Sequence, residues 1–530
     1  MPGRILSAIG ALRCSAVVWG LAGAFCAAIV TDALFFHASQ GLQRTTYDSM
    51  VRARLWSREA DPRIVILDID EASLAKMARE FGRWPWPRDP LATVLAHLER
   101  ENAAAIVWDV LFVDADVLHP GGDAAFDAAV RRSRRSHFSV LRVGPDADAD
   151  SQVTPALLPG LWAAASPGAR ASVIPPFLPA VAASPVGYSN TQADGDGVLR
   201  RYRYAESLAD GSVIQSVALS VARAIEPAQA RLAIERLQSP FFTPDPLMSW
   251  RASAFSYPRV PFWQEFDDAE NGRASARWKG KVVVVGSTAA ALHDYHPSPV
   301  APHHPGVMIL ATAIDNALHG DVPAEVPHAL LAAFAMVLCL ALAAWAQFRS
   351  IASLEPLLFL LPAALFVFSY ASLNGAPVFL ELQWPAAVAL TFLAILRVWV
   401  QLRREHWCAP PAAEGGLAVW PLERRTAWAE PALDRLIDAV ERHAPDCRIV
   451  APDAIHRWPG KLRWPELARH AAIVGPAASV EKARELISPR LRRLAGEGHE
   501  PVEVPHGSGR EGVAQLCLWL WARRERGVRA

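Results

Sequence analysis

No cysteine lies between residues 37 and 326, although the 530-residue chain has six cysteines in total. Disulfide bonds therefore cannot hold this segment, which must rely on an ordinary hydrophobic core and is long enough to form one. The other cysteines lack metal-ligand spacing, and we interpret them as small apolar side chains. The chain also lacks an excess of charge, because 53 basic residues balance 53 acidic ones. Nucleic acid is therefore not an expected partner.

Four long apolar runs stand out in the sequence. Each approaches the roughly 20 residues that cross about 30 Å of hydrocarbon. We predict transmembrane helices at residues 15–36, 329–348, 357–373 and 378–400. The first run has the basic flank of a signal peptide, but it is longer than a usual signal-peptide core, which favours an uncleaved anchor. The lipid bilayer is thus the first expected partner.

Positive charges in short loops indicate which ends of the spans face the cytoplasm. Arginines precede the first span, separate the second from the third and close the end of the fourth, whereas the turn at residues 373–377 has none. This pattern predicts a cytoplasmic N-terminus at residues 1–14, a periplasmic segment at residues 37–326 and a cytoplasmic segment after residue 400. The arginines are Arg4, Arg13, Arg349, Arg397, Arg403 and Arg404.

Short apolar runs that carry carboxylates mark buried strands in the predicted periplasmic segment. One run ends at Asp68 and Asp70, a second carries Asp109, and a third covers residues 281–286. Strands that alternate with helical segments indicate an α/β fold. Because such folds bind ligands at the carboxyl ends of their strands, the three aspartates suit a cation or the basic group of a ligand.

Several spaced motifs occur in one order along this segment. They are Asp68-Ile-Asp70-Glu71, Trp84-Pro-Trp86-Pro-Arg88, Asp109, Asp194-Gly-Asp196-Gly-Val-Leu-Arg200, and Val-Val-Val-Gly286-Ser-Thr with Asp294. In this order they resemble the second type of CHASE extracytoplasmic sensor domain, over roughly residues 40–325. The resemblance implies a bacterial inner-membrane receptor whose sensor domain is followed by three spans, and it suggests a homodimer. It names no ligand, because the ligands of that family are largely undefined.

The candidate ligand-binding residues come from these motifs, and several have structural alternatives. Arg88 and Asp109 would also suit a buried structural pair, the two tryptophans would suit the core, and the aspartates at 194 and 196 would suit a turn that bonds its own backbone. Four histidines in a proline-rich loop suit a metal or a pH sensor, or are simply solvated. No metal and no cofactor is expected. The candidates are Asp68, Asp70, Trp84, Trp86, Arg88, Asp109, Asp194, Asp196, Arg200 and Asp294, and the histidines are His293, His296, His303 and His304.

The predicted cytoplasmic segment begins with a linker at residues 401–416. Residues 417–530 then predict a small α/β domain with a compact parallel sheet. Receptors that resemble this chain commonly carry kinase or cyclase domains, but no kinase motif and no pair of cyclase aspartates is present, so we predict no enzyme activity. Two alternatives stay open: a scaffold that recruits a cytoplasmic protein, and a diverged nucleotide-handling enzyme. The latter would hold a phosphate with Arg510 in the loop at 506–510, and Asp453, His456 and Arg457, which follow a strand, suit the rim of a site.

The sequence thus predicts a multi-domain integral membrane protein of the α/β class in the bacterial inner membrane. It combines an α/β periplasmic sensor, a four-span helical membrane part and a small C-terminal α/β domain. The expected function is a receptor that relays the binding of an unknown extracytoplasmic ligand to the cytoplasmic domain. The expected route runs through a helix at residues 306–320 and the spans.

Overall fold

The computed structural model describes residues 14–55, 58–237, 245–348, 354, 356–375, 378–408, 417–428, 430–451, 469–493 and 496–503. The chain divides into two compact units. The larger unit consists of residues 40–328 and 368–381, and the smaller unit of residues 1–39, 329–367 and 382–530. The larger unit therefore includes the end of the third apolar helix and the chain that connects it to the fourth.

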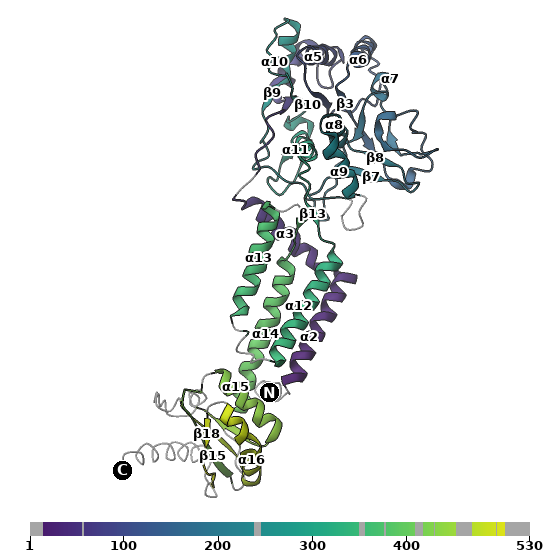
Figure 1. The fold of residues 1–530 in the computed structure, drawn as a ribbon. Helices are drawn as coiled ribbons and strands as arrows, with labels where there is room; N and C mark the ends of the chain where they lie inside the picture. The colour runs from purple at the N-terminus through teal and green to yellow at the C-terminus, as the bar shows by residue number, and fades with distance from the viewer. Residues whose placement is uncertain are drawn as a thin grey trace. The chain divides into compact units, whose positions relative to one another are not determined.

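A seven-stranded sheet forms the centre of the larger unit (Figure 1). Its order is β5-β3-β2-β10-β1-β9, with β6 paired to β3, and all pairs are parallel except β3 with β5. The three strands predicted from apolar runs, β1, β2 and β10, are confirmed and are buried along their whole length. The strands are β1 (Ile64–Asp68), β2 (Ala105–Trp108), β3 (Ser136–Arg142), β5 (Val173–Ile174), β6 (Val186–Tyr188), β9 (Arg259–Pro261) and β10 (Val282–Gly286).

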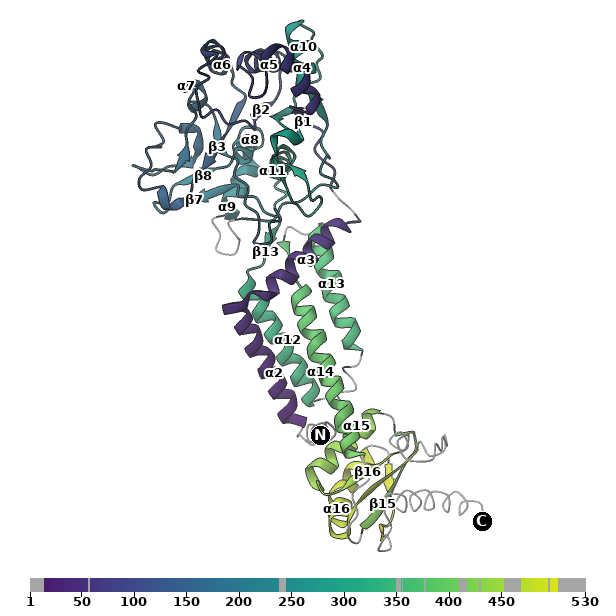
Figure 2. The ribbon, with the colours of Figure 1, turned by 180° about the vertical axis from the view of Figure 1, so that it is seen from behind.

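Alternate residues of the sheet enter two hydrophobic cores, because successive side chains of a strand point to opposite faces. Leu67 and Val285 belong to the first core, whereas Ile66 and Val284 belong to the second. The helices of each core can be followed in Figures 1 and 2. The first core contains α4 (Glu71–Phe81), α5 (Asp89–Arg100), α6 (Pro120–Arg132), α7 (Pro179–Ala182) and α10 (Phe262–Glu270); the second contains α3 (Ala38–Arg52), α8 (Val217–Ile225), α9 (Pro227–Leu237) and α11 (Gly306–His319).

Smaller sheets complete the larger unit. The antiparallel strands β4 (Trp162–Ala164), β8 (Val213–Gln215) and β7 (Ala205–Ser207) form one, and β11 (Tyr295–His296) pairs with β12 (His304–Pro305). The strand β13 (Ala324–Glu325), just before the second apolar helix, pairs in parallel with β14 (Val378–Phe379). Short 3₁₀ turns are η2 (Pro145–Ala147), η3 (Pro159–Leu161) and η4 (Ala290–Leu292).

Four helices are long and apolar enough to cross a membrane, at Ala16–Phe36, His328–Gln347, Leu357–Asn374 and Gln383–Trp407. The first combines α2 (Cys14–Thr31) with the π-helix η1 (Asp32–Phe36); the others are α12 (His328–Phe348), α13 (Leu357–Gly375) and α14 (Gln383–Trp407). Side chains of α2, α12 and α14 share one core within the smaller unit.

The range predicted for the fourth span, 378–400, is corrected by the structure. Residues 378 and 379 form β14, and the helix begins at Gln383. The apolar side chain of Phe379 enters the core of the larger unit, which explains why its hydrophobicity resembled the start of a span. The helix also continues to Trp407, so the first residues of the predicted linker at 401–416 are helical.

The C-terminal domain has the predicted alternation of strands and helices, but its sheet is antiparallel. β15 pairs with β17, β18 and β19, and β16 pairs with β17, in every case in opposite directions. A buried strand has the same apolar composition in either type of sheet, so the sequence did not distinguish them. The elements are β15 (Leu417–Arg424), α15 (Glu430–His443), β16 (Arg448–Val450), β17 (His470–Pro476), α16 (Ala477–Arg493), β18 (Gly496–Gly498) and β19 (Val502–Glu503).

Candidate ligand sites of the larger unit

The carboxyl ends of β1, β10 and β2 lie next to one another in the sheet. The chain leaves β1 toward α4 in the first core, but it leaves β10 toward α11 in the second. α/β proteins bind ligands at such a switch, because the diverging connections open a crevice at the strand ends. Three of the predicted residues, Asp68, Asp109 and Asp294, belong to this edge.

Asp68 ends β1 and is held by hydrogen bonds from the loop after the neighbouring strand. Its carboxylate accepts from the backbone N–H of Thr288 at 3.0 Å and from the Thr288 hydroxyl at 2.7 and 2.9 Å. Arg259 forms an ion pair with it at 3.3 Å. Burial nevertheless raises the pKa of Asp68 above its usual value. The residue thus fastens β1 to the loop after β10, and its acceptor sites are largely occupied.

Asp109 and Asp294 come together because two glycines permit it. A Cβ atom on Gly286 would lie 3.1 Å from the Cβ of Asp109, and one on Gly306 would lie 2.2 Å from a carboxylate oxygen of Asp294. Burial, and next the charge of Asp294, raise the pKa of Asp109 to about 7. His296 lies 3.3 Å from Asp294, and that hydrogen bond raises the pKa of the imidazole. Asp109 is thus a buried carboxyl group that gains and loses its proton near neutral pH.

The other predicted residues of the first core have structural partners. Asp70 caps α4 by accepting from the N–H of Ser73 at 2.7 Å. Arg88 forms an ion pair with Asp123, so the alternative of a pair with Asp109 is wrong. The rings of Trp84 and Trp86 meet edge to face at 5.0 Å, and both side chains pack on the first core. Each of these four side chains therefore has a structural role.

Arg200 gathers three carboxylates around a buried guanidinium. It donates to Asp48 at 2.8 Å from two nitrogens, to Asp194 at 2.8 Å and to Asp196 at 2.7 and 2.8 Å. The hydrogen bonds from Arg200 lower the pKa of Asp196 to about 2. Asp196 also accepts from the N–H of Val198, as the turn alternative predicted. The three predicted residues are therefore brought together, with Asp48 of α3 as a partner.

The histidine loop does not present its side chains as one group. His304 is buried and shares a hydrogen bond with the Ser298 hydroxyl at 2.9 Å, and burial lowers its pKa to about 4. His296 pairs with Asp294, and the ring of His293 lies 3.1 Å from the carbonyl of Ala291. These histidines therefore fit neither a shared metal site nor a set of fully solvated side chains, which were the alternatives considered from the sequence.

One group among the described residues has the spacing of metal ligands: Asp61, Asp315 and His319. It borders a cavity of about 390 Å³. Each carboxylate already has a guanidinium partner, however, since Arg63 binds Asp61 at 2.8 Å and Arg251 binds Asp315 at 2.8 Å. A cation would have to compete with both arginines, so the donor set fits a metal poorly.

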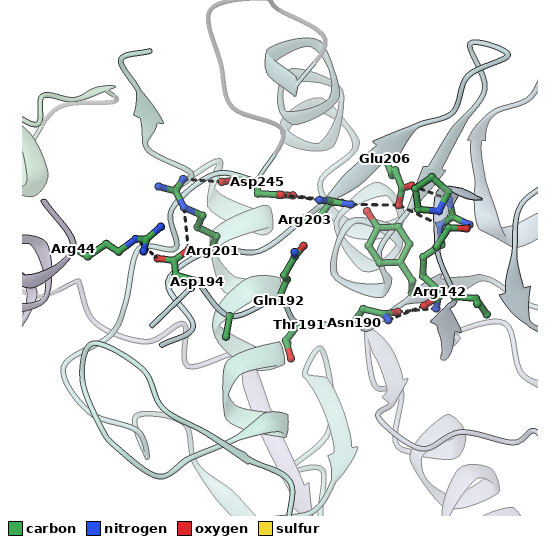
Figure 3. Close-up of a pocket in the computed structure, with 16 residues that line it drawn as sticks. Arg44, Arg142, Asn190, Thr191, Gln192, Asp194, Arg201, Arg203, Glu206 and Asp245 are labelled. Atoms are coloured by element: carbon green, nitrogen blue, oxygen red, sulfur yellow. Dashed lines mark hydrogen bonds and ion pairs between the residues drawn. The ribbon is translucent and has the colours of Figure 1, made fainter. Parts of the chain in front are cut away.

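A larger cavity of about 530 Å³ lies beside the Arg200 cluster (Figure 3). Its size is within the range of small-molecule sites. Arginines and carboxylates alternate around it, and Figure 3 shows Gln192 and Thr191 between the two charged sides. The charged lining residues are Arg44, Arg142, Arg201, Arg203, Asp194, Glu206 and Asp245, and Tyr188 and Asn190 also line it.

Sequence reasoning found Asp194 of this cavity but missed its arginines. One local signal was available: Arg201 and Arg203 are two residues apart, so an extended chain places them on one side and Arg200 on the other. The remaining lining residues come from distant parts of the sequence, including Arg44 and Asp245. Only the folded chain brings these together.

Comparison with known proteins gives one match. A family model described as the CHASE2 domain matches residues 23–346. No curated protein and no solved structure matches the chain significantly.

Proposed function

Since the chain belongs to the CHASE2 domain family, a family of extracytoplasmic sensor domains, we propose that it is a multi-pass receptor of the bacterial inner membrane. In this proposal the larger unit is the periplasmic sensor, the four apolar helices cross the bilayer and residues 417–530 are cytoplasmic. Four helices of suitable length and the distribution of arginines support this arrangement.

The observation that carries the proposed relay is the position of α14 in the chain. Immediately before this helix, Phe379 of β14 is fully buried in the second core of the larger unit. Its ring centroid lies 5.7 Å from that of Tyr47 on α3. Arg54, just after α3, donates to the carbonyl of Leu373 at 3.2 Å. The chain that enters α14 is therefore part of the sensor core.

The other end of α14 is part of the C-terminal domain. Arg404 binds Asp434 of α15 through two hydrogen bonds of 2.8 Å, and Arg403 donates to Asp438 at 2.7 Å. Trp407 is buried in the core that α15 and α16 share with β15. Along the chain, α14 thus follows a segment of the sensor core and ends in the C-terminal core, which is the covalent connection that the proposed relay uses.

A second connection follows the route expected from the sequence. α11 covers Gly306–His319 and is almost completely buried in the second core. It leads through β13 into α12. Because β13 pairs with β14, a shift of α11 would reach α12 and α14 together.

For the output, we propose that the C-terminal domain binds a separate cytoplasmic partner and has no catalytic activity of its own. The absence of kinase and cyclase motifs from the sequence supports this choice. The residues weighed for nucleotide binding, Asp453, His456, Arg457 and Arg510, lie outside the described residues.

The topology is tested by cysteine labelling in intact cells. Asp146→Cys and Glu497→Cys both place a thiol at an exposed position, in the larger unit and in β18. A reagent that cannot cross the inner membrane should label only the first variant. Labelling of Glu497→Cys in intact cells would refute the proposed orientation.

The relay is tested by hydrogen exchange on the full chain in lipid nanodiscs. Phe379→Leu should change amide exchange in β15 and α15, because it loosens the chain that enters α14. Phe368→Leu is the matched control, since Phe368 is an exposed phenylalanine of α13. Exchange that changes around β14 but stays at the wild-type level in residues 417–443 would refute the relay.

A further inference from the structure

The cavity of Figure 3 contains a buried hydroxyl that has no partner. Tyr188 lines the cavity and is 2% exposed, and its hydroxyl has no hydrogen-bond partner among the described residues. Buried polar groups almost always have partners, so an unpaired one calls for an explanation. Burial raises the pKa of this phenol, which keeps it protonated as a donor.

Within the described part of the chain, three guanidinium nitrogens around the cavity have a carboxylate oxygen only at ion-pair distance. Arg44 Nε lies 3.8 Å from Asp194, Arg201 Nε lies 3.6 Å from Asp194, and Arg203 Nη1 lies 3.7 Å from Glu206. All three distances exceed the normal range of an N–H···O hydrogen bond. These contacts are therefore ion pairs and not hydrogen bonds, so the N–H groups remain able to donate to an acceptor atom of a ligand.

The carboxylates of the cavity, in contrast, are occupied. Arg200 binds Asp194 at 2.8 Å and Arg142 binds Glu206 at 2.8 Å. Arg203 binds both oxygens of Asp245, at 2.5 and 2.7 Å. A cation would have to displace these arginines, whereas an anion would meet the Tyr188 hydroxyl and guanidinium nitrogens that hold their carboxylates only at ion-pair distance. The residues that line the cavity therefore favour a ligand whose own atoms accept hydrogen bonds.

We propose that this cavity is the ligand site of the sensor and that it binds a small molecule with a carboxylate or phosphate group. On one charged side of the cavity, the oxygens of this oxyanion accept hydrogen bonds from Tyr188 and Arg203, and a ligand that carries a second acidic group also meets Arg201 and Arg44 on the other side. The proposal deepens the receptor function proposed above and rests on it for its biological meaning, but the binding site itself does not depend on the relay.

Arg201 joins this site to the element that leads into the membrane helices. Its guanidinium also holds Glu325 of β13 through two hydrogen bonds, one of them 2.8 Å long. Burial, and next the charge of Glu325, raise the pKa of Glu381, which follows β14, to about 7. An oxyanion that draws Arg201 toward the cavity moves positive charge away from the carboxylates of Glu325 and Glu381. Binding is thereby coupled to the β13–β14 pair.

The test is calorimetric titration of the full chain in lipid nanodiscs with two probes, citrate and inorganic phosphate, against chloride at equal ionic strength. At least one oxyanion should bind the wild type, and the better probe indicates whether carboxylate or phosphate is preferred. Tyr188→Phe should fold normally, since it removes only an unpaired hydroxyl, and should weaken binding about 10-fold or more. Binding of neither probe above the chloride control would overturn the proposal.

Arg44→Gln provides a second variant that leaves the fold intact. Within the described residues, its one hydrogen bond is a long one to Gln40 at 3.5 Å. It should weaken oxyanion binding, whereas Arg170→Gln, an exposed arginine that does not line the cavity, should not. Equal binding by the wild type, Tyr188→Phe and Arg44→Gln would place the anion elsewhere and refute the site.

The outcomes separate the site from the receptor function. Binding that depends on Tyr188 but leaves hydrogen exchange in residues 417–443 unchanged would uphold the site and refute the relay. A relay that responds to Phe379→Leu in a chain that binds neither probe would refute the site alone.

Discussion

Asp109 should make the stability of the larger unit depend on pH. Its pKa rises from 3.8 in the unfolded chain to about 7 in the folded one, chiefly through burial. The folded state therefore holds this proton more tightly, so the contribution of Asp109 to stability is most favourable below about pH 4 and declines as the pH rises toward 7. Because a tenfold change in proton affinity corresponds to about 1.36 kcal/mol, the loss of stability across this pH range is on the order of 4 kcal/mol at most.

The perturbation that tests this is Asp109→Asn. An amide of the same size cannot ionise, so the variant should be more stable than the wild type at about pH 8 by up to this amount. The difference should shrink to near zero at about pH 4, where the wild-type carboxyl is largely protonated in the folded state and begins to be protonated in the unfolded state.

The assay is urea unfolding of the full chain in nanodiscs, followed by tryptophan fluorescence across that pH range. Trp108, Trp250 and Trp278 are buried in the larger unit and report its unfolding. The control is Asp150→Asn, an exposed aspartate for which no effect is expected. A variant that is less stable than the wild type at high pH would refute the reasoning, because it would mean that the ionised carboxylate makes a favourable contact.

Three further outcomes are expected in the same assay. Asp294→Asn should lower the raised pKa of Asp109, because the negative charge of Asp294 is the second cause of that rise. The pH range over which stability declines should therefore become narrower, and an unchanged range would contradict this. Phe379→Ala should destabilise the larger unit by about 3–5 kcal/mol, while the exposed Phe368→Ala should cost little; equal effects would show that Phe379 is not a core residue. Arg200→Gln leaves three carboxylates without their shared counter-ion and should cost about 3–5 kcal/mol, so a loss below about 1 kcal/mol would contradict the buried cluster.

The sequence predicted the parts of the fold that depend on local composition. Buried parallel strands are short apolar runs, and β1, β2 and β10 were recognised on that basis. The apolar helices were recognised from length in the same way. β14 was missed because two apolar residues next to a span are indistinguishable from the span itself. Only the pairing with β13, which precedes the second span, assigns them to the larger unit.

The candidate sites were predicted less completely, because their chemistry depends on contacts between distant residues. Arg200 was singled out, but its partner Asp48 lies 152 positions earlier in the chain. The cavity likewise combines Arg44, Tyr188 and Asp245 from separate elements. The position of Asp109 at a strand end was predicted from the sequence. Part of the rise in its pKa, however, comes from the charge of Asp294. Asp294 can approach because Gly286 and Gly306 have no side chains.

The pairing of β13 with β14 has the properties of a switch. It consists of two residue pairs, so it contributes little stability of its own, and elements of low local stability are those that move in allosteric transitions. Its strength depends on side chains: Phe379 in the core, and Glu325 held by Arg201. Coupling energies between sites are typically about 1–3 kcal/mol, comparable to one charge-assisted hydrogen bond. A ligand that competes for Arg201 is therefore strong enough to alter this pair, whereas it would be too weak to deform the seven-stranded sheet. For the relay proposed above, β13 and β14 are therefore the expected exit from the larger unit, because along the chain they lead into α12 and α14.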